Sequence, residues 1–303
     1  MSIEHWTLDE ARNVLIARYL YFVITAAWTW DALISYSNEA NVFVGRRLAL
    51  VDIVYILSRL LTGLTLYSVF PAIVLPRNNC VTPTHVVTWL GTAAAWLSTL
   101  LFLFRVNSVF YNLKPARIFF TFLWFIAAIG CLVVPFSFTA APVQPGGLCV
   151  VATVSRLGVI PSLSIAVFDL CVYLSISYRT INFRATPNKW AACKAFFTGE
   201  NTGTITKALL HTGQLYFFPM ACLEGCVLSI EFSTVLEASI LFQYEAAVLA
   251  AGLVFLNSMA CRVFRLLRRL KIEGETTIGQ SVEMSGMHFR RISRGEEVTG
   301  EIV

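Results

Sequence analysis

Charged side chains interrupt several long apolar stretches of this 303-residue chain. A charge near the centre of a bilayer costs at least about 2.5–3.5 kcal/mol, so each such residue needs a partner or a polar surrounding. These residue types in such places handle charges and protons, and they do not by themselves form covalent intermediates. The candidates are Asp31, Asp52, Arg59, Arg105 and Asp169.

Arg59 and Asp169 are predicted to lie at the same depth. Counting about 1.5 Å per helical residue places them about 13 Å and about 16 Å into a core about 30 Å thick. One hypothesis is an ion pair between the second and fifth spans, which protonation of Asp169 would release. Asp52, seven residues before Arg59, is a competing partner, and separate solvated sites are the third alternative.

The remaining acidic and basic residues lie nearer the ends of their spans. Asp31, Asp52 and Arg105 are placed near the cytosolic ends, where they either form a cluster that ties three helices together or reach the headgroups. Glu224 and Glu245 are placed within about two turns of the outer surface. They either line an outward-facing pocket for a small ligand or merely reach the interface.

Two cysteines and one serine are candidates for covalent modification. Of the 8 cysteines, Cys80 and Cys149 are the two that the predicted topology assigns to the oxidising side. They are predicted to form a disulfide bond over the mouth of the bundle; two free thiols are the alternative. Ser293 follows two arginines in the tail, which predicts phosphorylation by a basic-directed kinase or else a chance match.

Other chemistries lack their residues. The last apolar stretch has no lysine for a retinal Schiff base, and of 4 histidines only His211 is placed inside a span, which excludes a transmembrane haem. Metalloprotease and serine-hydrolase motifs are missing. We therefore expect no enzyme, catalytic residue, cofactor or metal site. The net charge of +5 is modest, so no nucleic-acid partner is expected.

The elements that must position these residues are membrane helices. The chain is 57% hydrophobic and 14% charged, against about 25% charged in a soluble domain. This predicts an all-α, multi-pass membrane protein in the bilayer, with seven helices joined in one bundle over residues 1–272. The predicted spans are 13–36, 49–75, 86–111, 118–139, 157–178, 206–230 and 238–262.

Lysine and arginine gather in alternate loops and after the last span. The positive-inside rule therefore places the N-terminus outside and the C-terminus in the cytosol. Residues 262–270 form a basic amphipathic pattern, typical of a helix on the inner leaflet, and 273–303 are predicted to be a disordered tail. The basic 179–206 loop is either solvated near anionic lipid or, with the tail, a docking surface for a cytosolic partner.

Five strings occur in order along the predicted spans. They are DIVYILSRLLTG (52–63), LFLFRVNSVFYN (101–112), FDLCVYLSISYRT (168–180), LLHTGQLYFF (209–218) and NSMACRVFRLLR (257–268). Together they resemble a large group of seven-helix membrane proteins found in mushroom-forming fungi. The resemblance covers most of residues 13–270 and implies the fold, but no biochemical activity.

Two functions fit these observations. The first is a receptor-like sensor in the plasma membrane, with an outer pocket and a basic inner face. It would lack the Asp-Arg-Tyr and Asn-Pro-x-x-Tyr elements of the main family of G-protein-coupled receptors, because the chain has Arg105-Val106-Asn107 and Asn257-Ser258-Met259-Ala260 there. The second is a transporter or channel that uses midplane charges, although inverted repeats are missing.

Overall fold

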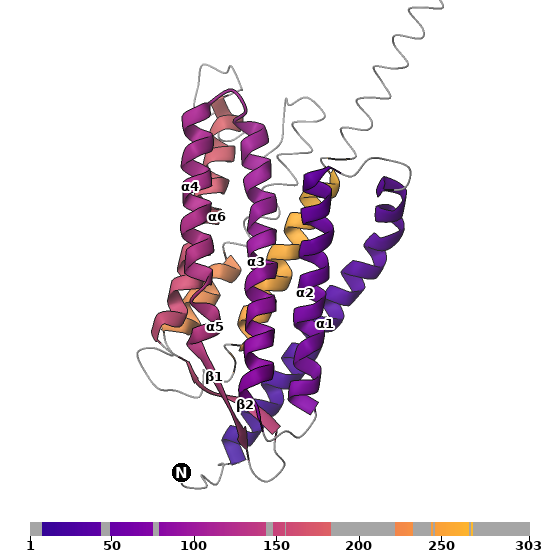
Figure 1. Ribbon diagram of the computed structural model, residues 1–303, viewed down its shortest axis with the longest axis vertical. Helices are drawn as coiled ribbons and strands as arrows, with labels where there is room; N and C mark the ends of the chain where they lie inside the picture. The colour runs from indigo at the N-terminus through magenta and orange to yellow at the C-terminus, as the bar shows by residue number, and fades with distance from the viewer. Residues whose placement is uncertain are drawn as a thin grey trace, which may run out of the picture. The chain divides into compact units, whose positions relative to one another are not determined.

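The structure, a computed structural model, consists mainly of long helices (Figure 1). It describes residues 8–43, 49–74, 79–143, 148–154, 156–182, 222–232, 244, 246–266 and 268. The elements are α1 (Leu8–Phe43), α2 (Leu50–Val74), α3 (Val81–Val109), α4 (Lys114–Cys131), α5 (Val134–Ser137), β1 (Phe138–Val143), β2 (Leu148–Val154), a 3-10 turn (Arg156–Gly158) and α6 (Val159–Asn182). Residues 222–232 and 246–266 are also helical.

Five helices in the described part of the chain are long and apolar enough to cross a membrane. They are Leu50–Pro71, Val81–Val109, Lys114–Ser137, Val159–Ile176 and Ala246–Leu266. The protein is therefore a helical, multi-pass membrane protein. The first and sixth predicted spans correspond to α1 and to the 222–232 helix, which are not among these five, so the count of seven and the orientation of the ends stay predictions.

The distribution of side chains suits lipid rather than water as the surrounding solvent. Large apolar side chains point outward, for example Leu60 (56% exposed), Ile118 (70%) and Phe122 (63%), whereas Thr62 and Ser98 are completely buried. A water-soluble protein rarely exposes a continuous apolar surface of this kind. The apolar faces of these helices therefore require a hydrocarbon environment.

Hydroxyl groups within these helices form hydrogen bonds inside their own helix. Thr62 Oγ1 donates to the carbonyl oxygen of Ser58 (2.8 Å), and Ser98 Oγ donates in the same way to Ala94 (2.8 Å). This pattern is common in membrane helices, where no water is present to satisfy the hydroxyl. Serine and threonine are therefore accommodated in the apolar segments at little cost.

One helix-packing region joins α1, α2 and the 246–266 helix. Tyr21, Trp28 and Leu66 are buried together, and Ala250 and Val254 pack against them. Tyr21 also donates a hydrogen bond from its hydroxyl to the carbonyl oxygen of Leu66 (3.1 Å). Two segments from opposite ends of the chain therefore share one core.

Gly63 allows the Trp28 ring to approach the backbone of α2. A Cβ atom at this position would lie 2.6 Å from Cη2 of Trp28, so Gly63→Ala forces the ring or the helix to move. Overpacking of this kind costs about 1–3 kcal/mol. Gly91→Ala is the matched control, because its Cβ would meet Thr65 Cγ2 at an ordinary 3.5 Å. In thermal unfolding of the detergent-solubilised protein we expect Gly63→Ala to unfold at a lower temperature than Gly91→Ala; equal temperatures would contradict the steric argument.

A second packing region joins α3, α4 and α6. Trp96 Nε1 donates to the carbonyl oxygen of Ala128 (2.9 Å), and Trp124 Nε1 donates to Thr99 Oγ1 (3.1 Å), so each tryptophan connects α3 with α4. α4 also packs along α6 (Figure 1). There Gly130 faces Ser164, whose Oγ would lie 2.5 Å from a Cβ at residue 130. Small residues at such crossings are typical of membrane helices.

The structure corrects the all-α prediction by adding a β-hairpin. β1 and β2 pair antiparallel from Phe138↔Val154 to Val143↔Leu148, with an irregularity between Thr139 and Ala140. The predicted fourth span, 118–139, corresponds to the helical stretch Lys114–Ser137, and its last residues, Phe138 and Thr139, belong to β1. An apolar run alone does not distinguish strand from helix. The signals that predict a hairpin are the branched residues of Leu148–Val154 and the Pro-Gly-Gly before them.

The hairpin is tied to α3 by a disulfide bond between Cys80 and Cys149, as the sequence predicts. Their Cα atoms lie 5.5 Å apart, and Cys80 is the residue immediately before α3. We call the end of the bundle with β1, β2 and this bond the hairpin end, and the other the opposite end (Figure 1). The second compact unit, Val263–Val303, is described at residues 263–266 and 268, which are helical.

Candidate functional site

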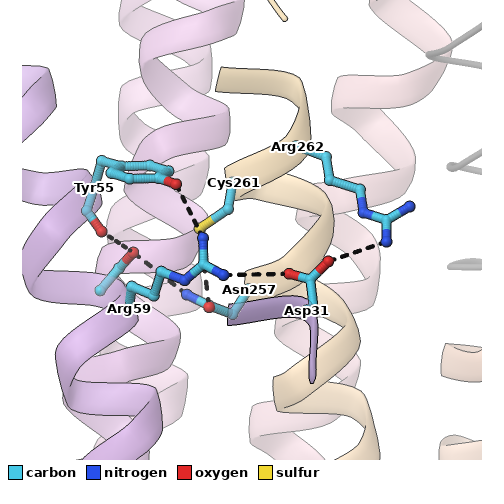
Figure 2. Close-up of polar contacts among 7 residues, drawn as sticks. Asp31, Tyr55, Arg59, Asn257, Cys261 and Arg262 are labelled. Atoms are coloured by element: carbon cyan, nitrogen blue, oxygen red, sulfur yellow. Dashed lines mark hydrogen bonds and ion pairs between the residues drawn. The ribbon is translucent and has the colours of Figure 1, made fainter. Parts of the chain in front are cut away.

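Asp31 of α1 binds two arginines that lie on two other helices (Figure 2). Its Oδ2 is 3.4 Å from Nη2 of Arg59 on α2, and its Oδ1 is 3.0 Å from Nη2 of Arg262, in the 246–266 helix. We call these three residues the Asp31 junction. One carboxylate thus connects three helices, one of which is more than 200 residues away along the chain.

The two arginines of the junction differ in exposure. The side chain of Arg59 is 11% exposed and that of Asp31 16%, whereas that of Arg262 is 46% exposed. Removing one partner of a buried ion pair is strongly destabilising, but an exposed pair contributes about 0–1 kcal/mol. The Asp31–Arg59 ion pair therefore stabilises the fold, whereas the Asp31–Arg262 ion pair can break with little loss of stability.

The structure does not bring Arg59 to Asp169. Arg59 contacts Asp31 and donates from Nη1 to the hydroxyl of Tyr55 (3.1 Å), whereas Asp169 interacts with Glu224. The rise per residue along a helix gives only the depth of each residue in the membrane. It could not fix which helices are neighbours, and α6 packs chiefly on α4 while α2 packs chiefly on α3.

A buried hydrogen-bond network continues from the junction into the bundle (Figure 2). Asn257 Nδ2 donates to Ser58 Oγ (3.3 Å) and to Ser98 Oγ (3.1 Å). Cys261 Sγ donates to Asn257 Oδ1 (3.9 Å). The network joins α2, α3 and the 246–266 helix, and all four residues are buried. The signal for it in the sequence is an asparagine within an apolar span.

Asp52 and Arg105 are buried at the ends of their helices. Asp52, 1% exposed, accepts a hydrogen bond from the backbone N–H of Ala49 (2.8 Å) at the start of α2. Arg105, 6% exposed, lies in the last turns of α3. Neither side chain reaches outward as a snorkelling charge would, so both belong to the interior of the bundle.

Asp169 and Glu224 form a second polar site, here called the acid pair. The two carboxyl groups lie close enough to interact, Asp169 on α6 and Glu224 on the 222–232 helix. Asp169 is 3% exposed. Neither of its carboxyl oxygens, nor Oε1 of Glu224, has a hydrogen-bond partner among the described residues. Buried carboxyl oxygens without donors are costly.

A third carboxyl group lies on the same helix interface. Glu231, 1% exposed, accepts a hydrogen bond at Oε1 from Ser162 Oγ (2.5 Å). Glu231 follows Glu224 by seven residues, and Ser162 precedes Asp169 by seven. The two contacts therefore share one antiparallel register, and seven residues, close to two turns, separate them by about 10 Å along the helices.

The remaining predicted residues have no described contacts. Glu245 and Ser293, the 273–303 tail, and the 179–206 loop beyond residue 182 lie outside the described residues. Glu224 is described, and it faces Asp169. Among the described residues no group of three or more His, Cys, Asp or Glu side chains is arranged to hold a metal ion. The chemistry available is therefore charge exchange at the Asp31 junction and proton or cation handling at the acid pair.

Comparison with known proteins leaves these two sites as the basis for any functional argument. Searches against protein-family models, curated proteins and solved structures find no match to this chain.

Proposed function

We propose that this protein is a seven-helix, receptor-like sensor of the plasma membrane, with its N-terminus outside and its C-terminus in the cytosol. The observation that carries the proposal is the Asp31 junction, in which one carboxylate holds both Arg59 and Arg262. A sensor needs helices with two arrangements of similar energy, and an exposed ion pair next to a buried one can break without unfolding the bundle.

The Asn257 network supports the same proposal. It connects the 246–266 helix to α2 and α3 by hydrogen bonds alone, at 3.1 and 3.3 Å. A small rotation of that helix would exchange these partners and strain the contact of Arg262, five residues after Asn257. A ligand at the hairpin end would then bias the opposite end, where basic residues and a cytosolic partner are predicted to meet.

The orientation is tested with epitope tags. A tag at residue 2 should be accessible to antibody on intact cells, and a tag at residue 303 should be accessible only after permeabilisation. The reverse result would overturn the orientation and the assignment of the hairpin end to the outside.

The sensor function is tested with a small-molecule screen by thermal shift, because a ligand that binds the native state raises the unfolding temperature. A hit should also change the distance between labels on α1 and on the 246–266 helix, without solute uptake into proteoliposomes. A hit that changes neither label distance nor uptake would contradict coupling through the Asp31 junction.

A transporter or channel is the second candidate, and the acid pair favours it. Buried carboxyl groups facing each other inside a membrane protein are typical of proton and ion pathways. Solute or proton uptake into proteoliposomes that Asp169→Asn abolishes would support this function over the first.

A further inference from the structure

The acid pair places two carboxyl groups against each other in the interior of the bundle. Asp169 is 3% exposed and both of its oxygens lack a hydrogen-bond partner among the described residues. Oε1 of Glu224 is also buried and also lacks a hydrogen-bond partner among the described residues. Two ionised carboxylates in such a site would repel each other, and each would lose its hydration without gaining hydrogen bonds in return.

The interface around the pair is well defined. The Ser162–Glu231 hydrogen bond fixes the same antiparallel register one heptad nearer the hairpin end. Since α6 and the 222–232 helix are held there, Asp169 and Glu224 face each other because of the helix pairing, and not because one side chain happens to bend. The pair is therefore a built feature of the interface.

The neighbouring helices bring few charges to this depth. α6 packs on α4 and α3. Gly130 of α4 lies opposite Ser164 of α6, and the two helices are antiparallel. Asp169 follows Ser164 by five residues and is therefore level with about residue 125 of α4. Trp124 in turn contacts Thr99 of α3. The titratable side chains of α3 and α4 are His85, Arg105, Lys114, Arg117 and Cys131, each six or more residues from this level.

Within the part of the chain that the structure describes, the other surrounding elements do not supply a cation at this level either. On α6 the nearest titratable side chains after Asp169 are Cys171 and Tyr173. Val227, one turn from Glu224, lies beside the 246–266 helix, where a Cβ at Gly252 would be 3.9 Å from its Cγ2. The nearest titratable residues described on that helix are Tyr244 and Cys261, eight or more residues away along it.

We propose that Asp169 and Glu224 together hold one monovalent positive charge, either a proton shared between the two carboxyl groups or a sodium ion bound between them. A single positive charge leaves the pair with one net negative charge. A shared proton would join one oxygen of each carboxyl group by a hydrogen bond, and a sodium ion would be bound by oxygens of both groups. A divalent ion would need more oxygen ligands than the described residues offer. The proposal is independent of whether the protein signals or transports.

The test uses the full-length protein in lipid nanodiscs and three variants. Glu231→Gln serves as the background, because it removes the other titrating carboxyl group of this interface. Asp169→Asn and Glu224→Gln are each added to it. If the charge is a proton, the infrared spectrum of the background protein at about pH 8, where exposed carboxyl groups are ionised, should contain a protonated-carboxyl band, and both added substitutions should shift or abolish it.

If the charge is a sodium ion, the same proteins distinguish it by thermal unfolding at alkaline pH. Sodium chloride should raise the unfolding temperature of the background protein relative to N-methylglucamine chloride at equal ionic strength, and Asp169→Asn should remove this difference. Should Asp169→Asn fail to fold, Glu224→Gln gives the same comparison from the other carboxyl group. A background protein with neither a protonated-carboxyl band nor a sodium effect, or with either one unchanged in the variants, would overturn the proposal.

Discussion

Asp31→Asn is expected to lower the free energy of unfolding by about 3 kcal/mol, which would make it one of the most damaging conservative substitutions in the chain. The amide keeps the size of the side chain but leaves the buried guanidinium of Arg59 without its carboxylate. The expected loss is at the low end of the range for a broken buried pair, because Arg59 keeps its contact with Tyr55.

The matched control is the other arginine of the same junction. Arg262→Ala removes a contact whose guanidinium side is half exposed, so the loss should stay below about 1 kcal/mol. Combining Asp31→Asn with Arg59→Met should give a coupling energy within the usual range of about 0.5–3 kcal/mol. Two results would contradict the view that the Asp31–Arg59 pair stabilises the junction. One is that the stability losses from Asp31→Asn and Arg59→Met simply add. The other is that Asp31→Asn and Arg262→Ala lower the free energy of unfolding equally.

Cys80→Ser should lower the free energy of unfolding by about 2–4 kcal/mol, the usual contribution of a disulfide bond that closes a long loop. The bond joins residues 69 apart and holds β2 to the start of α3. Cys149→Ser and the double variant should show the same loss, because each change breaks the same bond. Cys226→Ser, at an exposed free cysteine, is the control and should have little effect. Losses that add up in the double variant would indicate two independent thiol sites.

The helical elements follow from the sequence wherever the apolar run has clear limits. The predicted span 49–75 corresponds to α2 at Leu50–Val74 and the span 157–178 to α6 at Val159–Asn182. Both runs are closed by polar or turn-forming residues, so hydropathy alone fixes them. The predicted span 118–139 corresponds to the helical stretch Lys114–Ser137, and its last residues, Phe138 and Thr139, belong to β1 instead.

The sequence predicts which charged residues lie within the bundle, but it does not predict most of their partners. Burial of Asp31, Arg59 and Asp169 follows from their place in apolar spans, and the rise of a helix gives their depth. Which helices are neighbours depends on side-chain packing, such as that of Trp28 against Gly63. The spacing of apolar residues along the sequence does not predict such packing. The Cys80–Cys149 pair was predictable because these are the two cysteines that the predicted topology assigns to the oxidising side.

The shared register of Ser162–Glu231 and Asp169–Glu224 limits how the lengths of these two helices can vary. Deleting or inserting one residue between 162 and 169, or between 224 and 231, rotates one contact about 100° away from the other. Length variants of one residue in these segments should thus lose one of the two contacts. Variants that add or remove seven residues in both helices together would keep the two contacts on one face, so this interface tolerates changes in length only in whole heptads.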